Sequence, residues 1–192
     1  MKITKSVLAK LIKEEVEALT INPSSEIDVE VEEEPAVSKI GEALKAYIAS
    51  LRAGQLWFHA AHHLAKGTGF VGDHSELLSS IYTALDGDYD TAVEKGVSLT
   101  GDEMVACPMH VIANVMPILK RYKTPAGMNQ TEILQTGLAF IKAHYELLTT
   151  IYDELEAANE LPLGLDDFLA SSANQYDKFV YMLQQRLKDS VG

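Results

Sequence analysis

The sequence contains very little cysteine and tryptophan, and it has no long hydrophobic run. Among 192 residues there is one cysteine, Cys107, and one tryptophan, Trp57. A single cysteine excludes a disulfide within the chain and favours a reducing compartment. No apolar run approaches the roughly 20 residues that a membrane span needs, and no secretory hydrophobic segment is present. We therefore expect a cytoplasmic protein with no membrane partner.

Positive charge is also scarce. Lys and Arg number 16 against 28 Asp and Glu, so the formal net charge is −12, while 47% of the residues are hydrophobic. The length and the apolar fraction predict one folded domain of ordinary size with additional segments. An acidic surface repels nucleic acid and suits cations as ligands or substrates.

The first part of the chain differs from the rest. Apolar residues between positions 3 and 19 recur at helical spacing, which predicts an amphipathic helix within residues 1–20. Its lysines come early and its glutamates late, against the helix dipole, so this helix should need a partner surface. Residues 21–36 carry two prolines and many acidic residues without a sustained period, which predicts a flexible linker.

Residues 37–192 predict an all-α domain. Long helical patterns cover about 38–65, 73–99, 129–158 and 165–189. The connection between the second and third contains Pro108, Pro117 and an apolar stretch near 111–119, which predicts one short crossover helix separated from its neighbours by proline. Together these patterns predict a ferritin-like four-helix bundle with a crossover, rather than a simple up-down bundle.

Three carboxylates on the second long helix are the first candidate for chemistry. Asp86, Asp90 and Glu94 follow one another at four-residue spacing, so they lie on one helix face. Repulsion among them is relieved either by solvent, in which case they are an ordinary acidic surface, or by a bound cation. With an imidazole nearby, oxygen donors of this kind suit Fe(II), Mn(II) or Zn(II).

Histidines gather at the end of the first long helix, in WFHAAHHLAKG (57–67). In an antiparallel pair of helices, His62 and Asp90 of one chain would lie about 20 Å apart along the axis. Either they are unrelated, or a second copy of the chain supplies the carboxylates across a two-fold axis. A rival site within one chain would combine His62 and His63 with His74 and Glu76.

Three segments, taken in order, carry a resemblance to a known family. His62-His63-Leu64-Ala65-Lys66-Gly67 is similar to the motif His-Trp-Asn-x-Lys/Arg-Gly. The segment 90–94 is similar to an Asp-x-x-x-Glu motif, and Asp177-Lys178-Phe179-Val180-Tyr181 is similar to Asp-Lys-Phe-Leu-Trp. From about residue 40 to residue 189, the sequence resembles the DNA-protecting mini-ferritins, the Dps family.

The resemblance implies a ferroxidase, an oxidoreductase that converts Fe(II) to Fe(III) and stores the product in a hollow shell of twelve subunits built from dimers, as protection against oxidative stress. It implies an iron site in which His62 of one subunit meets Asp90 and Glu94 of another. It also implies entry of iron through acidic pores. The candidate pore residues surround the turn before the last helix: Glu154, Glu156, Glu160, Asp166 and Asp167. The alternative for these five is a solvated acidic loop.

The sequence departs from the family pattern at the site itself. His63 stands where the family has tryptophan. The family's second pair of iron ligands, a His and an Asp, is incomplete. His74 matches the first if one residue is inserted after it; otherwise Ser75 and Ser79 fall there. On either alignment the aspartate falls on Leu78 or Ser79, so His63, His74, Glu76 and Asp86 are the alternative donors.

The remaining histidines and the cysteine suggest structural roles. His59 lies one turn before His62 and His63, where we expect a peripheral residue. His110 and His144 stand alone on apolar helices and are expected to be core or surface residues, and Cys107 a structural thiol.

A different class of function follows from the departures and the N-terminal segment. In this alternative the chain is a ferritin-like structural or binding module with weakened ferroxidase activity, which docks a protein partner through the helix in residues 1–20. The opening MKITKSVLAKLIKEE also resembles a leader of otherwise unrelated proteins of marine tailed phages, which would suit a virion-associated protein. DNA binding through the early lysines, with a nucleoid location, is the third hypothesis, and the acidic charge disfavours it.

Overall fold

The computed structural model describes residues 39–188, and all the regular secondary structure in this part of the chain is helical, without strands. The helix and the linker expected within residues 1–36 lie outside the described residues. No helix in 39–188 is both long enough and apolar enough to cross a membrane. In chain order the elements are α2 (Lys39–Leu64), α3 (Phe70–Gly72), the π-helix η1 (Asp73–Leu78), α4 (Ser79–Thr100), the 3-10 helix η2 (Glu103–Ala106), α5 (Pro108–Leu119), α6 (Gln130–Ala157) and α7 (Leu163–Lys188).

Local chemistry explains where these helices begin and end. Asn129 caps α6 in a reciprocal box with Glu132, in which each side chain accepts a hydrogen bond from the other's backbone N–H. Gly101 ends α4 in the left-handed conformation, with φ 69°, which glycine adopts without strain. Pro108 is the first residue of α5, where its missing N–H costs nothing.

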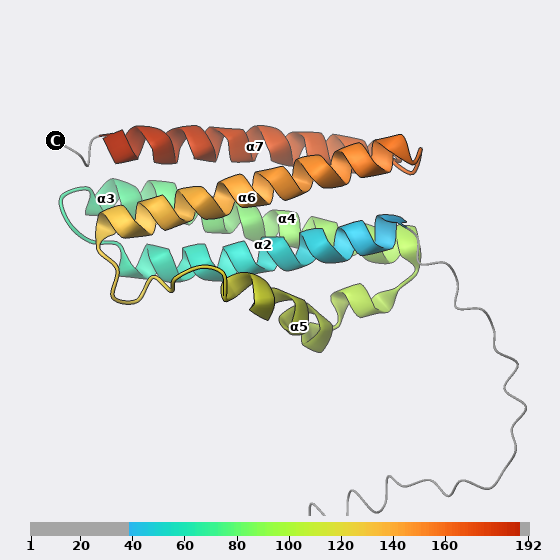
Figure 1. The fold of residues 1–192 in the computed structure, drawn as a ribbon, viewed down its shortest axis with the longest axis horizontal. Helices are drawn as coiled ribbons and strands as arrows, with labels where there is room; N and C mark the ends of the chain where they lie inside the picture. Colours follow the sequence, from blue (N-terminus) through green and yellow to red (C-terminus); the bar gives the residue numbers. More distant parts are fainter. Residues whose placement is uncertain (1–38, 189–192) are drawn as a thin grey trace, which may run out of the picture. The chain divides into compact units, whose positions relative to one another are not determined.

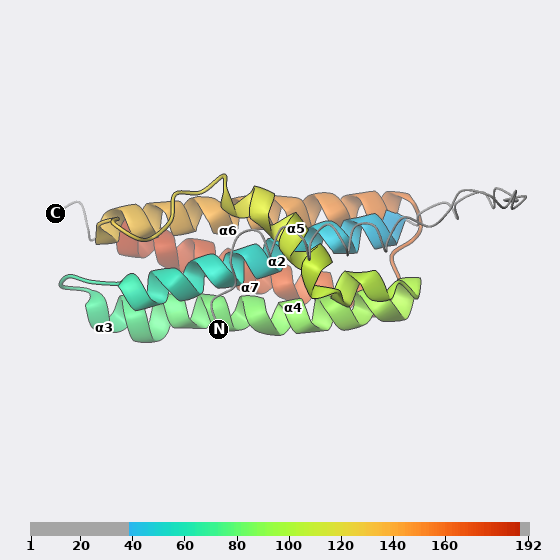
Figure 2. The ribbon, with the colours of Figure 1, turned by 90° about the horizontal axis from the view of Figure 1, so that it is seen from below.

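Two antiparallel pairs, α2 with α4 and α6 with α7, make the bundle (Figure 1). Cross-helix contacts also show that α2 is antiparallel to α6, since Ser50 meets His144 and Lys66 meets Gln130, and that α4 is antiparallel to α7. The chain must therefore travel the length of the bundle between α4 and α6. It does so through η2 and α5, which crosses the outside of α2 (Figure 2).

The predicted four-helix bundle with a crossover is confirmed, and the helix bounds agree within a few residues. Proline placement was predicted incorrectly at one position. Pro117 lies inside α5 rather than at a break. Because it falls in the last turn, two residues before the helix ends, only local hydrogen bonding is lost. The π-helix η1 and the short helix α3 were not predicted.

Close helix approach organises the core around large aromatic residues. A side chain at Gly137 of α6 would lie 3.0 Å from the ring of Phe58, and one at Gly54 of α2 would lie 3.0 Å from Leu85. Phe58 and Phe140 are almost completely buried, and their rings meet edge to face at 6.1 Å. The two glycines thus let α2 approach both α4 and α6.

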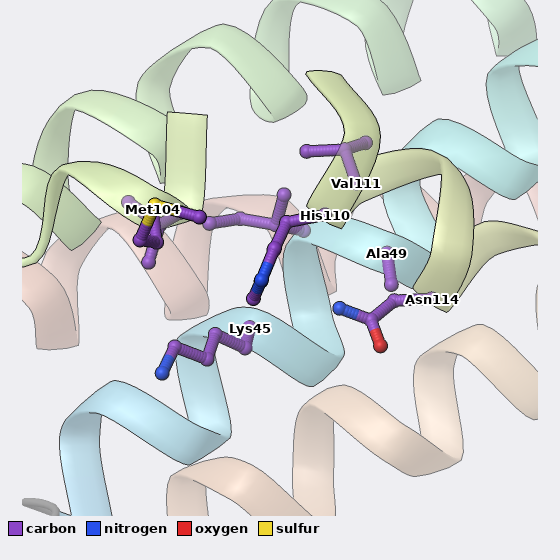
Figure 3. A pocket seen from close by; sticks show the side chains of 8 residues that line it. Lys45, Ala49, Met104, His110, Val111 and Asn114 are labelled. Atoms are coloured by element: carbon purple, nitrogen blue, oxygen red, sulfur yellow. The ribbon is translucent and has the colours of Figure 1, made fainter. Parts of the chain in front are cut away.

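The space between α2 and α5 contains His110. Figure 3 shows His110 beside Lys45 and Asn114, with Met104 at the rim. The free volume there is about 10 Å³, which is at the lower limit for a single water molecule. His110 is exposed and has a cation nearby, so it is a surface residue, as expected.

His144 is one of the few buried polar residues of the bundle centre. It is 1% exposed, and its Nδ1 shares a hydrogen bond of 2.8 Å with the Ser50 hydroxyl. Its ring stacks on Tyr47 at 5.2 Å and meets the edge of Tyr176 at 4.7 Å. Burial lowers the pKa of His144 to about 3, so the folded protein keeps this imidazole neutral.

This shift predicts a pH dependence of stability. Below the ordinary His pKa of 6.5 the unfolded chain takes up a proton that folded His144 excludes, so stability falls as pH drops toward about 3. The contribution approaches about 1.4 kcal/mol per pH unit. Urea unfolding of wild type and His144→Gln between about pH 7 and about pH 4 measures it. The variant should lose this slope, exposed His110→Gln should keep it, and parallel curves for wild type and His144→Gln would contradict the assignment.

Candidate metal site

Two histidines face each other where α2 ends and η1 begins. Nδ1 of His62 lies 2.7 Å from the carbonyl oxygen of His74, and Nδ1 of His74 lies 2.8 Å from the carbonyl oxygen of His62. A carbonyl only accepts, so both Nδ1 atoms carry the hydrogen and donate it. In the neutral rings each Nε2 then has a free lone pair. Metal-binding histidines are oriented in this way, with the second ring nitrogen donating to a carbonyl or a carboxylate.

Aromatic contacts fix the orientation of both rings. The two imidazoles stack with centroids 3.8 Å apart and an interplanar angle of 17°. Phe70 stacks on the outer face of His74 at 4.9 Å, and Tyr82 of α4 meets His62 at 5.3 Å. Sequence reasoning did not find Phe70 or Tyr82, because neither has the spacing or the chemistry of a ligand.

A π-helix lies where the two alignments of the second histidine differ. A π turn holds one residue more than an α turn, and η1 runs from Asp73 to Leu78. It therefore accommodates the one-residue insertion after His74 that the first alignment required. In the second alignment the place belongs to Ser75 and Ser79, but Ser79 donates its hydroxyl hydrogen to the backbone carbonyl of Ser75 at 2.6 Å. The residue that meets His62 is His74.

The aspartate position of the family pattern has no carboxylate. Leu78 is fully buried in the core. Ser79, the other residue on which this position falls, uses its hydroxyl within its own helix. The structure therefore offers no carboxylate at the position where the family pattern has its aspartate.

A buried ion pair anchors η1 to the rest of the bundle. Asp73 is 1% exposed and accepts hydrogen bonds from Nε of Arg186 at 2.8 Å and from Nε2 of Gln130 at 2.9 Å. Gln130 also accepts from the backbone N–H of Lys66 at 2.9 Å, so α2, α6 and α7 converge here. A side chain at Gly69 would collide with the Arg186 guanidinium. This network holds His74 against His62.

The three predicted carboxylates of α4 are in different surroundings. Asp86 forms an ion pair of 3.3 Å with Arg52, whose guanidinium also lies 5.2 Å from the ring of Tyr89. Asp90 and Glu94 are exposed, and neither forms a hydrogen bond or an ion pair with any residue of 39–188. Asp86 is therefore neutralised within its own chain, whereas the other two carboxylates are open to an external cation.

One chain does not bring His62 to these carboxylates. His59 touches Tyr82 at 4.7 Å and Arg52 touches Tyr89 at 5.2 Å, which fixes the antiparallel register of α2 and α4. In that register Asp90 lies about 16 Å from His62 along the bundle, at about 1.5 Å per residue. Within the described part of the chain, no group of three or more His, Cys, Asp or Glu residues is arranged to hold a metal.

Of the rival site within one chain, only the contact between His62 and His74 is formed. His63 lies 5.0 Å from His62 between ring centroids, but its Nε2 turns back to His59. Glu76 is exposed and lines a cleft with Tyr181 and Arg186 of α7. The four residues of the rival site thus lie in three different places: His62 and His74 together, His63 beside His59, and Glu76 in the cleft with α7.

Trp57 does not replace the tryptophan that the family motif has after its histidine. It is 3% exposed, donates its indole N–H to the carbonyl of Lys123 at 3.0 Å, and packs against Phe58 and Phe140. These contacts make it a core residue.

The five acidic residues predicted for iron entry do cluster at the α6–α7 turn. Asp166 accepts a hydrogen bond of 3.0 Å from Tyr152, and Glu160 is partly buried. The remaining three, which are exposed, are Glu154, Glu156 and Asp167. Their role in iron entry stays a prediction.

The fold places this chain among helical bundles of the ferritin-like class, and solved Dps structures share it. Dps from Microbacterium arborescens in the high iron form superposes with a TM-score of 0.66 at 21% identity, over 81% of this chain and 97% of that one. Mycobacterium smegmatis Dps in a tetragonal form gives 0.64 at 18% identity, over 80% and 92%. Its C-terminal deletion mutant gives 0.63 at 18% identity, over 79% and 98%. No protein-family model and no curated protein sequence matches the chain. The chain therefore has the Dps fold.

The anchor at Asp73 can be tested by mutation. Asp73→Ala removes the buried carboxylate that accepts hydrogen bonds from Arg186 and Gln130, and should lower the free energy of unfolding by about 3 kcal/mol. Asp86→Ala, which breaks the exposed pair with Arg52, should cost at most about 1 kcal/mol. Urea unfolding measures both values, and hydrogen exchange should show faster opening of residues 70–78 in Asp73→Ala. Equal costs for the two variants would contradict the anchoring role.

Proposed function

We propose that this chain is a Dps-like mini-ferritin. In this proposal identical subunits pair and assemble into a hollow shell of twelve, oxidise Fe(II) at sites shared between two subunits, and keep the Fe(III) inside. Iron is the substrate and the cargo of such a protein. Its removal in this form would protect a cell from damage by iron and peroxide.

The observation that carries the proposal is the reciprocal pair of hydrogen bonds between His62 and His74. It leaves the Nε2 of each ring free of hydrogen in the neutral state, a tautomer that can bind a divalent metal ion. A histidine with a purely structural role needs no such free nitrogen. The paired rings therefore favour metal binding over simple packing.

Two exposed carboxylates complete the donor set in this proposal. The carboxylates of Asp90 and Glu94 make no hydrogen bond or ion pair with other residues of 39–188, and Asp90 lies about 16 Å along the bundle from His62 of its own chain. A two-fold axis would bring α4 of one copy against the α2 end of the other, and every such contact creates two equivalent sites. An imidazole with two carboxylates binds Fe(II) and leaves coordination positions open for an oxidant.

The electron balance of the reaction requires an oxidant, and peroxide or dioxygen supplies it. Two Fe(II) ions give the two electrons that, with two protons, reduce one hydrogen peroxide to water. The protein contributes binding and orientation: His62 and the two carboxylates hold the ion, and the net charge of −12 attracts cations. The acidic cluster at the α6–α7 turn is our candidate for iron entry.

A second candidate function rests on one specific observation. The aspartate position falls on buried Leu78 or on Ser79, so the donor set around His74 contains no carboxylate from its own chain. Weak oxidation would leave a ferritin-like binding module, with residues 1–20 docking a protein partner. A virion or the nucleoid would be its location, and DNA the less favoured partner.

Iron oxidation by single variants separates the two functions. Adding Fe(II) under anaerobic conditions and then peroxide should give oxidation well above buffer for the wild type. His62→Ala and Asp90→Ala should each slow it by about 10–100-fold, since each removes a ligand. Glu146→Ala, which removes an exposed carboxylate of α6, should leave the rate unchanged. Oxidation no faster than buffer, or unaffected by either ligand variant, would overturn the ferroxidase proposal.

Mixed assemblies test whether the site is shared. Co-expressed His62→Ala and Glu94→Ala chains pair at random, so half of the dimers contain one of each. Each mixed dimer has one intact site out of two, so about a quarter of wild-type oxidation should return. Either variant alone should stay at its own low residual rate. If the mixture oxidises no more iron than the separate variants, the ligands do not come from two chains.

A further inference from the structure

Two further histidines of α2 face each other outside the pair described above. Nε2 of His59 lies 3.2 Å from Nε2 of His63, and the ring centroids are 4.7 Å apart. The residues are four positions apart, so their side chains leave adjacent turns on the same helix face. Both side chains are exposed.

The spacing of the two nitrogens matches a chelated metal ion. Two metal–nitrogen bonds of about 2.0–2.1 Å that meet between a right angle and the tetrahedral angle separate their nitrogens by about 2.8–3.4 Å. The observed 3.2 Å lies within this range. Two histidines four residues apart on one helix are also the spacing with which helices present imidazoles to zinc.

The hydrogen bonding of His59 and His63 also allows the pair to bind a metal ion. Without a metal, one Nε2 must donate its hydrogen to the other, because a direct contact between two lone pairs is repulsive. Neither Nδ1 makes a hydrogen bond to any residue of 39–188, so the one hydrogen shared between the Nε2 atoms can be replaced by a hydrogen on the solvated Nδ1 of the donating ring without breaking another protein contact. A metal ion then replaces the shared hydrogen. The site needs no movement of the backbone.

The surroundings position His59 and keep the pair distinct from the iron ligands. Tyr82 lies against His59 at 4.7 Å between centroids, which restricts its ring. His62 directs its Nδ1 to the backbone of His74 and is not part of the chelate. No carboxylate is bonded to His59 or His63 among the described residues, so the donor set is purely imidazole.

We infer that His59 and His63 form a second metal site, a two-imidazole chelate for late divalent transition metals such as Cu²⁺, Ni²⁺ or Zn²⁺, with water in the remaining positions. The two imidazole donors determine which metal ions the site prefers. Imidazole suits these ions, and affinity rises from Fe²⁺ through Ni²⁺ to Cu²⁺ and falls again at Zn²⁺. A site without carboxylates therefore prefers them to Fe(II), which the proposed shared site would take.

Calorimetric titration of the full chain with Cu²⁺ alone tests the inference. His59→Ala and His63→Ala should each weaken one Cu²⁺ site per chain by about 10²-fold, because the second imidazole of a chelate acts at high effective concentration. His110→Ala, which removes an exposed histidine of α5, should leave that site unchanged. Equal Cu²⁺ affinity in wild type, His59→Ala and His63→Ala would overturn the inference.

Spectroscopy and iron oxidation separate this site from the proposed function. Electron paramagnetic resonance of the bound Cu²⁺ should show coupling to two imidazole nitrogens in wild type and to one in either variant. The same signal in both variants as in wild type would place the ion elsewhere. His59→Ala should keep the wild-type rate of Fe(II) oxidation. If wild type fails to oxidise iron, the proposed function fails, yet the Cu²⁺ result still decides the chelate.

Discussion

The reciprocal hydrogen bonds between His62 and His74 are the interaction on which the candidate site depends. Each ring gives its Nδ1 hydrogen to the other residue's backbone carbonyl, so each keeps a free Nε2. For these two hydrogen bonds to form, the start of η1 must lie beside the last turn of α2. The extra residue of the π turn, and the pair of Asp73 with Arg186, bring it there.

The same geometry keeps the two kinds of candidate iron donor apart within one chain. The imidazoles lie at one end of α2, and the free carboxylates lie more than halfway along α4. Fe(II) prefers to have both kinds of donor, and one chain does not supply them in one place. A two-fold pair resolves this mismatch and adds no new residues. The proposed iron chemistry is thus linked to association between copies.

Much of the fold follows from helical periodicity and from the position of prolines and glycines. The apolar spacing that predicts four helices is local, so it can be seen in one sequence. The antiparallel register was also sufficient to predict that His62 and Asp90 of one chain stay apart. The same register placed His74 among the candidate neighbours of His62, but neither the π turn between Asp73 and Leu78 nor the reciprocal hydrogen bonds could be predicted from the spacing.

Other features depend on contacts between residues distant in sequence. The anchor between Asp73 and Arg186 spans α7 and η1, and no local pattern indicates it. His59 was expected to be peripheral, and His63 to be an alternative iron donor. Their mutual orientation depends on ring rotations that four-residue spacing allows but does not fix.

The central claim is that His62 of one copy and Asp90 and Glu94 of another bind the same iron ion. Diffraction from crystals soaked anaerobically with Fe(II), recorded at the iron absorption edge, tests it most directly. An anomalous peak is expected between Nε2 of His62 and the two carboxylates of a two-fold related subunit. A peak whose ligands all come from one chain, or no peak beside His62, would contradict it.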